Sequence, residues 1–230
     1  MLRKSLAWLA PLALTLVGVG SNLQSVSAQS TDDGYDLKEF SITYDVLANF
    51  GPVINPQLNV LNVELTGESI GNAPFGLTNF ISRNYGRFET RGSQIFGTFD
   101  ANPAVFGIEG EIRGDVYFSN DPNNPNQLFG RASDTALIDL EQNTIRGGGT
   151  IAIFDGAGVF KNATGIITFT QEDTLTPGSP EGPLSSRGEA TLNFSIRVPR
   201  QVPEPTATTT LIAMGVTGAG LVLRRKGTFN

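Results

Sequence analysis

Carboxylate side chains are the main acid–base equipment of this 230-residue chain, because it contains no histidine and no cysteine. Three pairs of acidic residues lie close together in the sequence: Glu109 with Glu111, Asp139 with Glu141, and Glu172 with Asp173. Residues two apart on a strand share one face, so Glu109 and Glu111 would form a glycosidase-like pair if that face lined a cavity. A solvated strand face is the favoured interpretation. We therefore assign no catalytic residues and leave enzymatic activity open, with a non-enzymatic role preferred.

The missing residue types exclude several kinds of site. Without cysteine there is no thiolate nucleophile, no cysteine–zinc site and no disulfide, so stability must come from packing. Without histidine the chain lacks the commonest general base and the usual third member of a serine triad. The segment DPNNPN, residues 121–126, offers oxygen atoms to calcium, but its single carboxylate and its prolines are more typical of a plain loop. We predict no metal and no cofactor.

The formal net charge of −6 hides a separation of charge along the chain. Several basic side chains lie in the two terminal segments: Arg3, Lys4, Arg224, Arg225 and Lys226. Residues 29–203 keep 11 basic and 21 acidic side chains, which gives a net charge of −10. Such a domain would repel nucleic acid phosphates and anionic lipid surfaces, so no nucleic acid partner is expected.

The beginning of the chain has the three zones of a secretory signal. The basic MLRK is followed by the mostly apolar SLAWLAPLALTLVGVG and the polar SNLQSVSAQ. Val26 and Ala28 fit the small pockets of a signal peptidase, and cleavage after Ala28 would make Gln29 the new N-terminus. A retained membrane helix is the alternative, but Pro11 interrupts the apolar run and leaves it short for a span. We predict a signal peptide, with its signal helix, over residues 1–28.

The end of the chain contains a short motif, an apolar segment and a basic cluster, in that order. The motif is Pro203, Glu204 and Pro205, the apolar segment is 206–223, and the cluster is Arg224, Arg225 and Lys226. A helix over the apolar segment would be about 27 Å long, just enough to cross a hydrocarbon core. The basic cluster would hold its end in the cytoplasm, which places the middle of the chain outside the inner membrane.

This tail resembles the PEP-CTERM sorting signal of exported Gram-negative and cyanobacterial proteins, which has the same three parts. The resemblance implies that an exosortase recognises Pro203, Glu204 and Pro205 and removes the transmembrane helix, often in organisms that secrete exopolysaccharide. An ordinary tail anchor is the alternative. We interpret residues 201–230 as the sorting signal. The implied partners are signal peptidase, exosortase, the inner membrane before cleavage, and exopolysaccharide, and the implied final location is the cell envelope or the extracellular space.

Residues 29–200 have the pattern of an all-β domain. Alternating apolar residues predict strands over 38–46 and 189–198, each with one buried face. Shorter β-prone runs lie between them, separated by Gly, Asn, Asp or Pro: 61–65, 112–118, 136–140, 150–154 and 166–170. We predict loops over 121–127 and 172–189, and a tight turn or bulge at the glycines 147–149.

The run GGGTIAIFDGAGVFKNATGIITFT, followed later by GEATLNFSIRV, resembles the closing hairpins of dirigent and allene oxide cyclase-like proteins. The matching positions are Phe160, Ala163, Thr164 and Gly165, and the fold implied is an eight-stranded antiparallel barrel with a central cavity. We expect this barrel rather than a β-sandwich, since closing the sheet removes exposed edges. No counterpart of the catalytic or cavity residues of these families is found, so their chemistry is not transferred.

The expected function is that of an exported envelope or extracellular-matrix protein with a structural or ligand-binding β domain. One alternative is a barrel enzyme or a carrier for a small apolar ligand. A packed, dry interior without a buried polar cluster would count against that alternative. The other is a calcium-dependent adhesin, which calcium would have to stabilise against melting.

Overall fold

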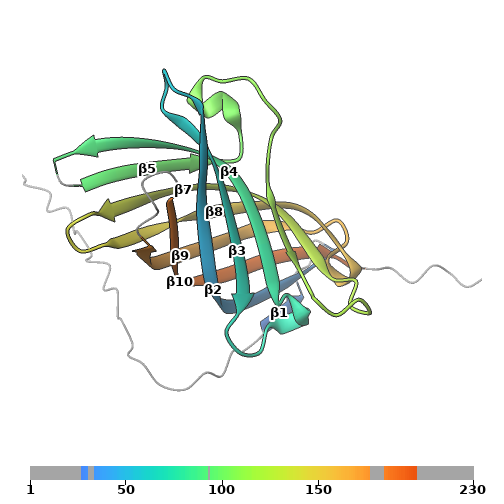
Figure 1. Ribbon diagram of the computed structural model, residues 1–230. Coiled ribbons are helices and arrows are strands. Elements are labelled where there is room, and N and C mark those ends of the chain that lie inside the picture. The colour runs from blue at the N-terminus through green and yellow to red at the C-terminus, as the bar shows by residue number, and fades with distance from the viewer. Residues whose placement is uncertain (1–26, 31–33, 93, 177–183, 201–230) are drawn as a thin grey trace, which may run out of the picture.

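The computed structural model describes residues 27–30, 34–92, 94–176 and 184–200 (Figure 1). In this part of the chain the protein is built mainly of antiparallel strands, which confirms the all-β prediction. The predicted signal segment up to residue 26 and the whole predicted sorting signal, including the helix 206–223, lie outside the described residues. Within the described ranges, no helix has the length and apolar character needed to cross a membrane.

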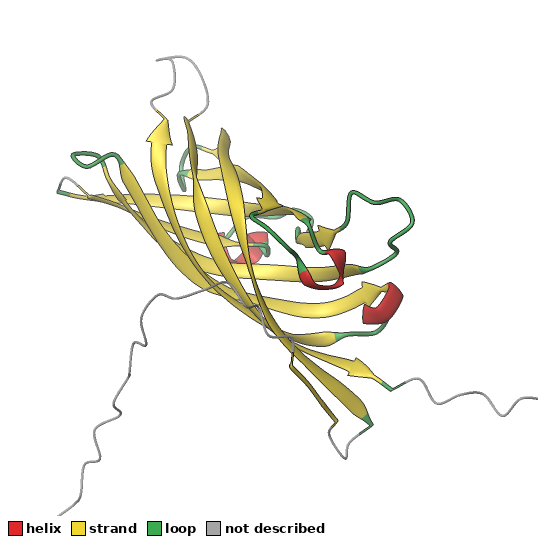
Figure 2. Ribbon diagram, turned by 90° about the horizontal axis from the view of Figure 1, so that it is seen from below, coloured by secondary structure: helices red, strands yellow, loops and turns green. Residues whose placement is uncertain are grey.

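Ten strands follow one another in the described residues: β1 Ser27–Ser30, β2 Tyr35–Asn55, β3 Val60–Ser69, β4 Asn79–Arg91, β5 Gln94–Asp100, β6 Asp115–Phe118, β7 Gln127–Asp139, β8 Thr144–Ala157, β9 Thr164–Thr176 and β10 Leu184–Pro199. Three short 3-10 helices lie in their connections: η1 Pro74–Gly76, η2 Pro103–Phe106 and η3 Gly158–Phe160. Figure 2 shows that the strands are long and steeply tilted.

The strand pairings return to their starting point. The order runs β2, β10, β9, β8, β7, β5, β4, β3, and β3 pairs with β2 again. Two short strands fill the remaining stretches of edge. β1 pairs the beginning of β2, ahead of the residues that pair β3, and β6 lies between β4 and β7 beside β5. This ring of pairings leaves little strand edge open to another chain.

Alternating burial along the strands places one face inside the ring. Phe40, Ile42, Tyr44 and Val46 of β2 are all buried, as their spacing predicts. The residues 192–198 of β10 follow the same alternation. Burying a side chain of this size contributes about 1.5–3 kcal/mol, so the inward face is the main source of stability in a chain without disulfides.

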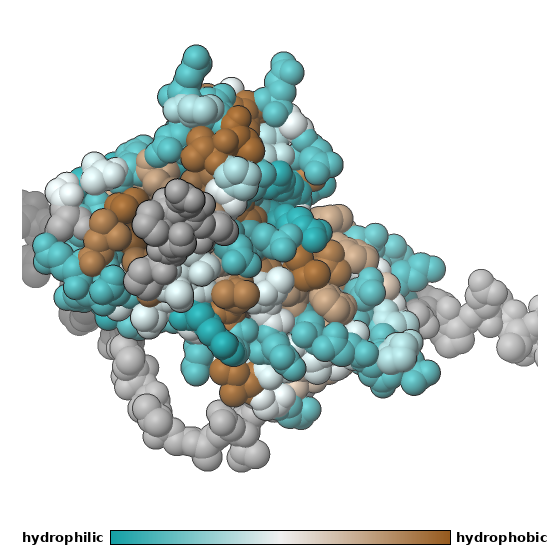
Figure 3. All heavy atoms as spheres, in the orientation of Figure 1, coloured by the Kyte–Doolittle hydropathy of each residue, from teal (hydrophilic) through white to brown (hydrophobic). Residues whose placement is uncertain are grey.

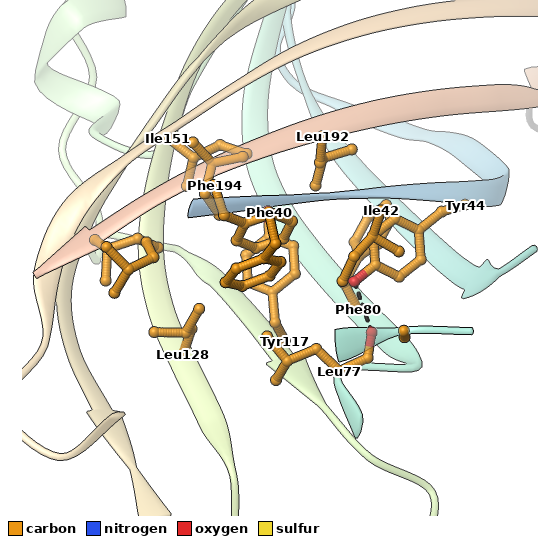
Figure 4. Close-up of a cluster of buried hydrophobic side chains, with 14 of the residues drawn as sticks. Phe40, Ile42, Tyr44, Leu77, Phe80, Tyr117, Leu128, Ile151, Leu192 and Phe194 are labelled. Atoms are coloured by element: carbon orange, nitrogen blue, oxygen red, sulfur yellow. Dashed lines mark hydrogen bonds between the residues drawn. The ribbon is translucent and has the colours of Figure 1, made fainter. Parts of the chain in front are cut away.

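The inward side chains form two apolar clusters. The larger cluster, which Figure 4 shows in part, contains Phe40, Tyr44, Phe80, Tyr117, Phe160 and Phe194 among others. The smaller cluster contains Ala48, Phe50, Leu61, Val63, Phe99, Ile138, Ile145 and Leu175. Between them lies the cavity described below, so the interior is not one continuous apolar core.

The connection between β3 and β4 folds over the larger cluster. Its η1 helix carries Phe75, whose ring lies 5.2 Å from that of Phe40 and 5.1 Å from that of Phe160, measured between centroids. Phe75 has a left-handed backbone with φ of 60°, which is strained for a bulky residue. The side-chain amides of Asn124 and Asn126 each donate a hydrogen bond of 3.0 Å to its carbonyl oxygen. The loop before β7 therefore holds this connection in place.

The outward face is mixed in character. Figure 3 shows hydrophobic patches interleaved with hydrophilic residues on one side of the molecule. The exposed rings of Phe96 and Phe154 lie under arginine guanidinium groups, at 4.8 Å from Arg91 and 4.7 Å from Arg131. In such cation–π contacts the guanidinium group covers the apolar face of the ring and loses little of its own hydration.

Several predicted boundaries are wrong. The predicted loop 172–189 is mostly strand, because β9 continues to Thr176 and β10 begins at Leu184. The predicted strand 112–118 shortens to Asp115–Phe118. The glycines 147–149 form neither a turn nor a bulge: they pair regularly with both β7 and β9 in the middle of β8.

Candidate ligand-binding cavity

A cavity lies inside the ring, between the two apolar clusters. Phe80, Tyr117 and Leu192 of the larger cluster and Phe50 and Phe99 of the smaller cluster contribute to its wall. Its volume is about 70 Å³. It would hold about two to five water molecules. The interior therefore has room for a small guest.

Polar side chains form a band around this cavity, which we call the polar band. Its members are Ser82 and Asn84 from β4, Asp115 from β6, Asp134 from β7, Gln171 and Asp173 from β9, and Ser186 from β10. All of them except Asp115 line the cavity directly. A mostly apolar wall with a few convergent polar groups is typical of small-molecule sites.

Asp173 is the centre of one half of the band. Its Oδ2 accepts hydrogen bonds from Gln171 Nε2 at 2.8 Å and from Ser186 Oγ at 2.7 Å. Its Oδ1 is buried and has no hydrogen-bond partner among the described residues. Burial raises the pKa of Asp173, and the two hydrogen bonds offset only part of that rise. One oxygen of this carboxyl therefore accepts hydrogen bonds from the protein, and the other is free to accept a hydrogen bond from a guest.

Asp115 lies in the other half, opposite Ser82 of β4 and Gly130 of β7 in the strand register. Burial raises the pKa of Asp115 to about 7, and the nearby Ser82 side chain opposes this rise more weakly. Even so, neither Asp115 oxygen has a partner with hydrogen-bond geometry among the described residues. An unpaired buried carboxylate costs several kcal/mol, so the group keeps its proton more readily than an exposed aspartate.

Asp134 is coupled to Asp115. Burial is the largest cause of the raised pKa of Asp134, and the charges of Asp115 and then Asp100 raise it further. Asp134 retains partial exposure because it faces the cavity. A charge on Asp115 therefore makes it harder for Asp134 to lose its proton.

Tyr117 lies near this pair, and Tyr44 lies near Tyr117. Tyr44 donates its hydroxyl hydrogen to the carbonyl oxygen of Leu77 at 2.8 Å (Figure 4). Burial raises the pKa of both Tyr44 and Tyr117 above the usual tyrosine value, and for Tyr117 the charge of Asp115 adds to the effect. Both hydroxyls therefore stay neutral and act as donors or acceptors rather than as bases.

Glycines make room for the carboxyls. Gly188 of β10 lies beside Asp173, and a Cβ atom there would be 2.6 Å from Asp173 Oδ1. Gly149 of β8 lies opposite Asp134, and a Cβ atom there would overlap the Asp134 side chain. Gly147 belongs to the cavity wall itself. The glycine run therefore allows neighbouring strands to approach closely and leaves internal space. It does not form the turn or bulge that the sequence predicted.

The carboxylate pairs singled out in the sequence have other roles. Glu109 and Glu111 lie exposed in the irregular segment before β6, away from the cavity. Asp139 accepts backbone hydrogen bonds from Glu141 and Gln142 at 2.9 and 3.0 Å, so it stabilises the turn between β7 and β8. The third pair separates, because neighbours on a strand face opposite ways.

Glu172 and Asp173 show this separation. Glu172 points outward and pairs with Arg146 at 3.1 Å, whereas Asp173 points into the polar band. The sequence thus contained one genuine cavity residue among the paired carboxylates. Its partner in the predicted pair is a surface ion-pair residue.

The asparagine-rich segment 121–126 uses its oxygens within the protein. Asp121 Oδ1 accepts from the backbone and side-chain nitrogens of Asn123 at 2.9 and 3.1 Å. Asn126 Oδ1 accepts from the backbone nitrogen of Val159 at 3.0 Å. In the described residues, no group of three or more acidic side chains is arranged to hold a metal ion.

The predicted processing residues are only partly within the described chain. Ala28 and Gln29 lie in β1, opposite Lys38 and Leu37 of β2. Cleavage after Ala28 would therefore cut β1 and leave Gln29 and Ser30 as its paired residues. The residues assigned to sorting, Pro203, Glu204, Pro205, Arg224, Arg225 and Lys226, lie outside the described residues.

Comparison with known proteins adds no family. No protein-family model matches the chain, and no curated protein or solved structure matches it either. The functional argument therefore depends on the cavity and on the terminal sequence signals.

Proposed function

We propose that this protein is an exported β-barrel protein that binds a small molecule in its central cavity. The observation that carries the proposal is the polar band: buried oxygens of Asn84, Asp115 and Asp173 lack partners beside an internal space. Each unpaired buried polar group costs about 1–3 kcal/mol, which a purely structural interior would avoid by apolar packing. A guest that pairs with these oxygens would recover that cost.

The barrel is the finer part of the fold proposal. The ring of eight paired strands supports it, since the two sheets of a sandwich would leave edges unpaired. It also agrees with the fold implied by the resemblance of 147–198 to dirigent and allene oxide cyclase-like proteins. In a ring of this size the interior holds side chains or one small ligand.

Export is the second part of the proposal. The signal-like segment 1–28 and the PEP-CTERM-like tail 201–230 support delivery across the inner membrane, transient anchoring there, and release by an exosortase acting at Pro203–Pro205. The acidic domain between them would then reside in the cell envelope or the extracellular matrix. The proposed role is therefore that of a carrier or receptor for a small molecule outside the cytoplasm.

A polarity-sensitive fluorescent probe that enters apolar cavities tests the binding proposal. We expect the full-length protein to bind the probe, and the variant Ala132→Phe to lose binding, because Ala132 is 4% exposed and lines the cavity. Ala152→Phe is the matched control, since Ala152 lies on the outward face of β8. Circular dichroism and melting curves would confirm that both variants fold. Equal probe binding by both variants, or none by the unmodified protein, would contradict the proposal.

A further inference from the structure

The unpaired atoms of the polar band share one chemical property: they are hydrogen-bond acceptors. They are Asn84 Oδ1, Asp115 Oδ1, Asp115 Oδ2 and Asp173 Oδ1, each on a residue that is at most 3% exposed. One further unpaired oxygen, Asn62 Oδ1, lies on β3 at an outward position between the inward Leu61 and Val63. At the band, what is missing is therefore a donor.

No basic side chain supplies that donor. The residues that line the cavity in the described chain include neither lysine nor arginine. The arginines of the neighbouring strands are paired on the outer face instead: Arg83 with Glu64, Arg146 with Glu172, and Arg187 with Asp45. Among the described residues that line the cavity, none gives the inner aspartates a counter-charge.

We propose that the cavity binds a compact amine, whose ammonium group donates hydrogen bonds to free acceptors of the polar band, drawn from Asp173 Oδ1, Asn84 Oδ1 and the carboxyl of Asp134. This inference deepens the proposed function and rests on it. An ammonium group has three donors and no acceptor, which complements the unpaired oxygens of this site when its carboxyls are ionised. Hydrogen bonds to ionised groups are also the stronger ones.

The apolar wall fits the other end of such a molecule. Phe50, Phe99 and Phe169 line the cavity, and aromatic faces attract ammonium groups as well as alkyl chains. The cavity volume of about 70 Å³ limits the size of the guest. A dry cavity of about 150 Å³ admits benzene, so a guest here has only a few non-hydrogen atoms.

The charge of the aspartates gives the site a pH dependence. The charges of Asp115 and Asp100 act on Asp134, the charge of Asp134 acts on Tyr117, and Asp173 accepts hydrogen bonds from Gln171 and Ser186. An ammonium ion favours the ionised carboxyls, so amine binding should strengthen as pH rises from 5 to 8. A neutral guest that accepts hydrogen bonds would favour the protonated carboxyls and show the opposite trend.

The test compares propylamine with 1-propanol on the full-length protein, by ligand-observed NMR. We expect propylamine to bind with a dissociation constant at least roughly tenfold lower than that of propanol. Asp173→Asn or, independently, Asp134→Asn should remove this advantage, so that each variant binds propylamine no more tightly than propanol. Glu172→Gln is the matched control, because it removes a neighbouring carboxylate that faces outward.

The outcomes separate the two proposals. Equal binding of propylamine and propanol, or an amine advantage that survives both aspartate variants, would overturn the amine assignment and leave the cavity proposal standing. Stabilisation by calcium or magnesium alone that is lost in Asp173→Asn would overturn it in favour of a metal site. Failure of the fluorescent probe, propanol and propylamine alike to bind would overturn the proposed function itself.

Discussion

Asp134 of β7 and Gly149 of β8 face each other directly in the strand register, and a Cβ atom at Gly149 would lie 2.4 Å from the Cβ atom of Asp134. A Cβ atom at Gly149 would also lie 2.5 Å from the carbonyl oxygen of Ser133. The two strands therefore approach each other closely at this point, and a residue with a side chain at 149 would force them apart.

We predict that Gly149→Ala destabilises the protein by about 1–3 kcal/mol, because an added methyl group in a packed interior forces side chains and backbone apart. Gly147→Ala should cost less, since the nearest atom to a Cβ there is 3.1 Å away. Urea unfolding curves of both variants measure the difference. Equal losses at the two positions would show that the contact with Asp134 is not the cause.

Acidification should stabilise the fold over part of the pH range. Burial raises the folded-state pKa of Asp115 to about 7 and also raises the pKa values of Asp134 and Asp173. Between the unfolded-state value near 4 and the folded-state value, the folded protein binds more protons than the unfolded chain. The contribution of these groups to the free energy of unfolding should therefore be greatest below pH 4, and it should fall as pH rises toward 7.

Asp115→Asn tests this prediction. The amide has no proton to lose, so the variant should show a flatter fall of unfolding free energy from pH 4.5 to 7.5 and should be more stable than the unmodified protein at pH 7.5. Each unit of pKa difference corresponds to roughly 1.4 kcal/mol. Chemical denaturation at a series of pH values measures both quantities. An identical pH profile in the two proteins would contradict the raised pKa of Asp115.

The loop before β7 should matter for the end of the domain that Phe75 covers. Asn126→Ala removes one hydrogen bond to the Phe75 carbonyl oxygen and one from the Val159 nitrogen, and should cost about 1–3 kcal/mol. Asn123→Ala is the control, because the Asn123 side chain bonds only locally to Asp121. Hydrogen exchange of the backbone amides of residues 75–78 should increase in the first variant alone. Similar exchange in both variants would show that Asn126 does not hold the connection.

The strands with a dry inward face were predictable. In β2 and β10, apolar residues occupy every second position through Phe40–Val46 and Leu192–Val198, and these segments are strands with those residues buried. Alternation is a direct consequence of burying one face of a pleated strand in an apolar core. The structure of such segments can therefore be predicted from their own sequence.

The strands that build the polar band were not predictable in the same way. At the end of β9 and the start of β10, the inward positions include Gln171, Asp173, Ser186 and Gly188, and the sequence there resembles a polar loop. The inward face is polar because it faces the cavity, so apolar alternation stops where the site begins. The only local signal was parity: Asp173 keeps the two-residue spacing of Ile167 and Phe169.

The position of Asp134 was hidden for a related reason. Ala132, Asp134 and Ala136 are small or polar inward residues, and they read as a weak strand beginning only at 136. The glycines 147–149, which pair with residues 134–136, were predicted to form a tight turn or bulge, although they serve close packing within the sheet. Contacts between strands determine which residues occupy these positions, and the sequence of a single strand does not show those contacts. The signal segment, the sorting motif and the export route stay predictions from sequence.

Native mass spectrometry of the protein recovered from the envelope and extracellular fractions of its own organism tests the central claim most directly. We predict a chain that starts at Gln29, ends near Pro203, and carries one small non-covalently bound molecule that is absent from the Ala132→Phe variant. A chain of this mass with no bound molecule in any fraction, or the same bound mass in the Ala132→Phe variant, would contradict the claim that the cavity is a ligand site.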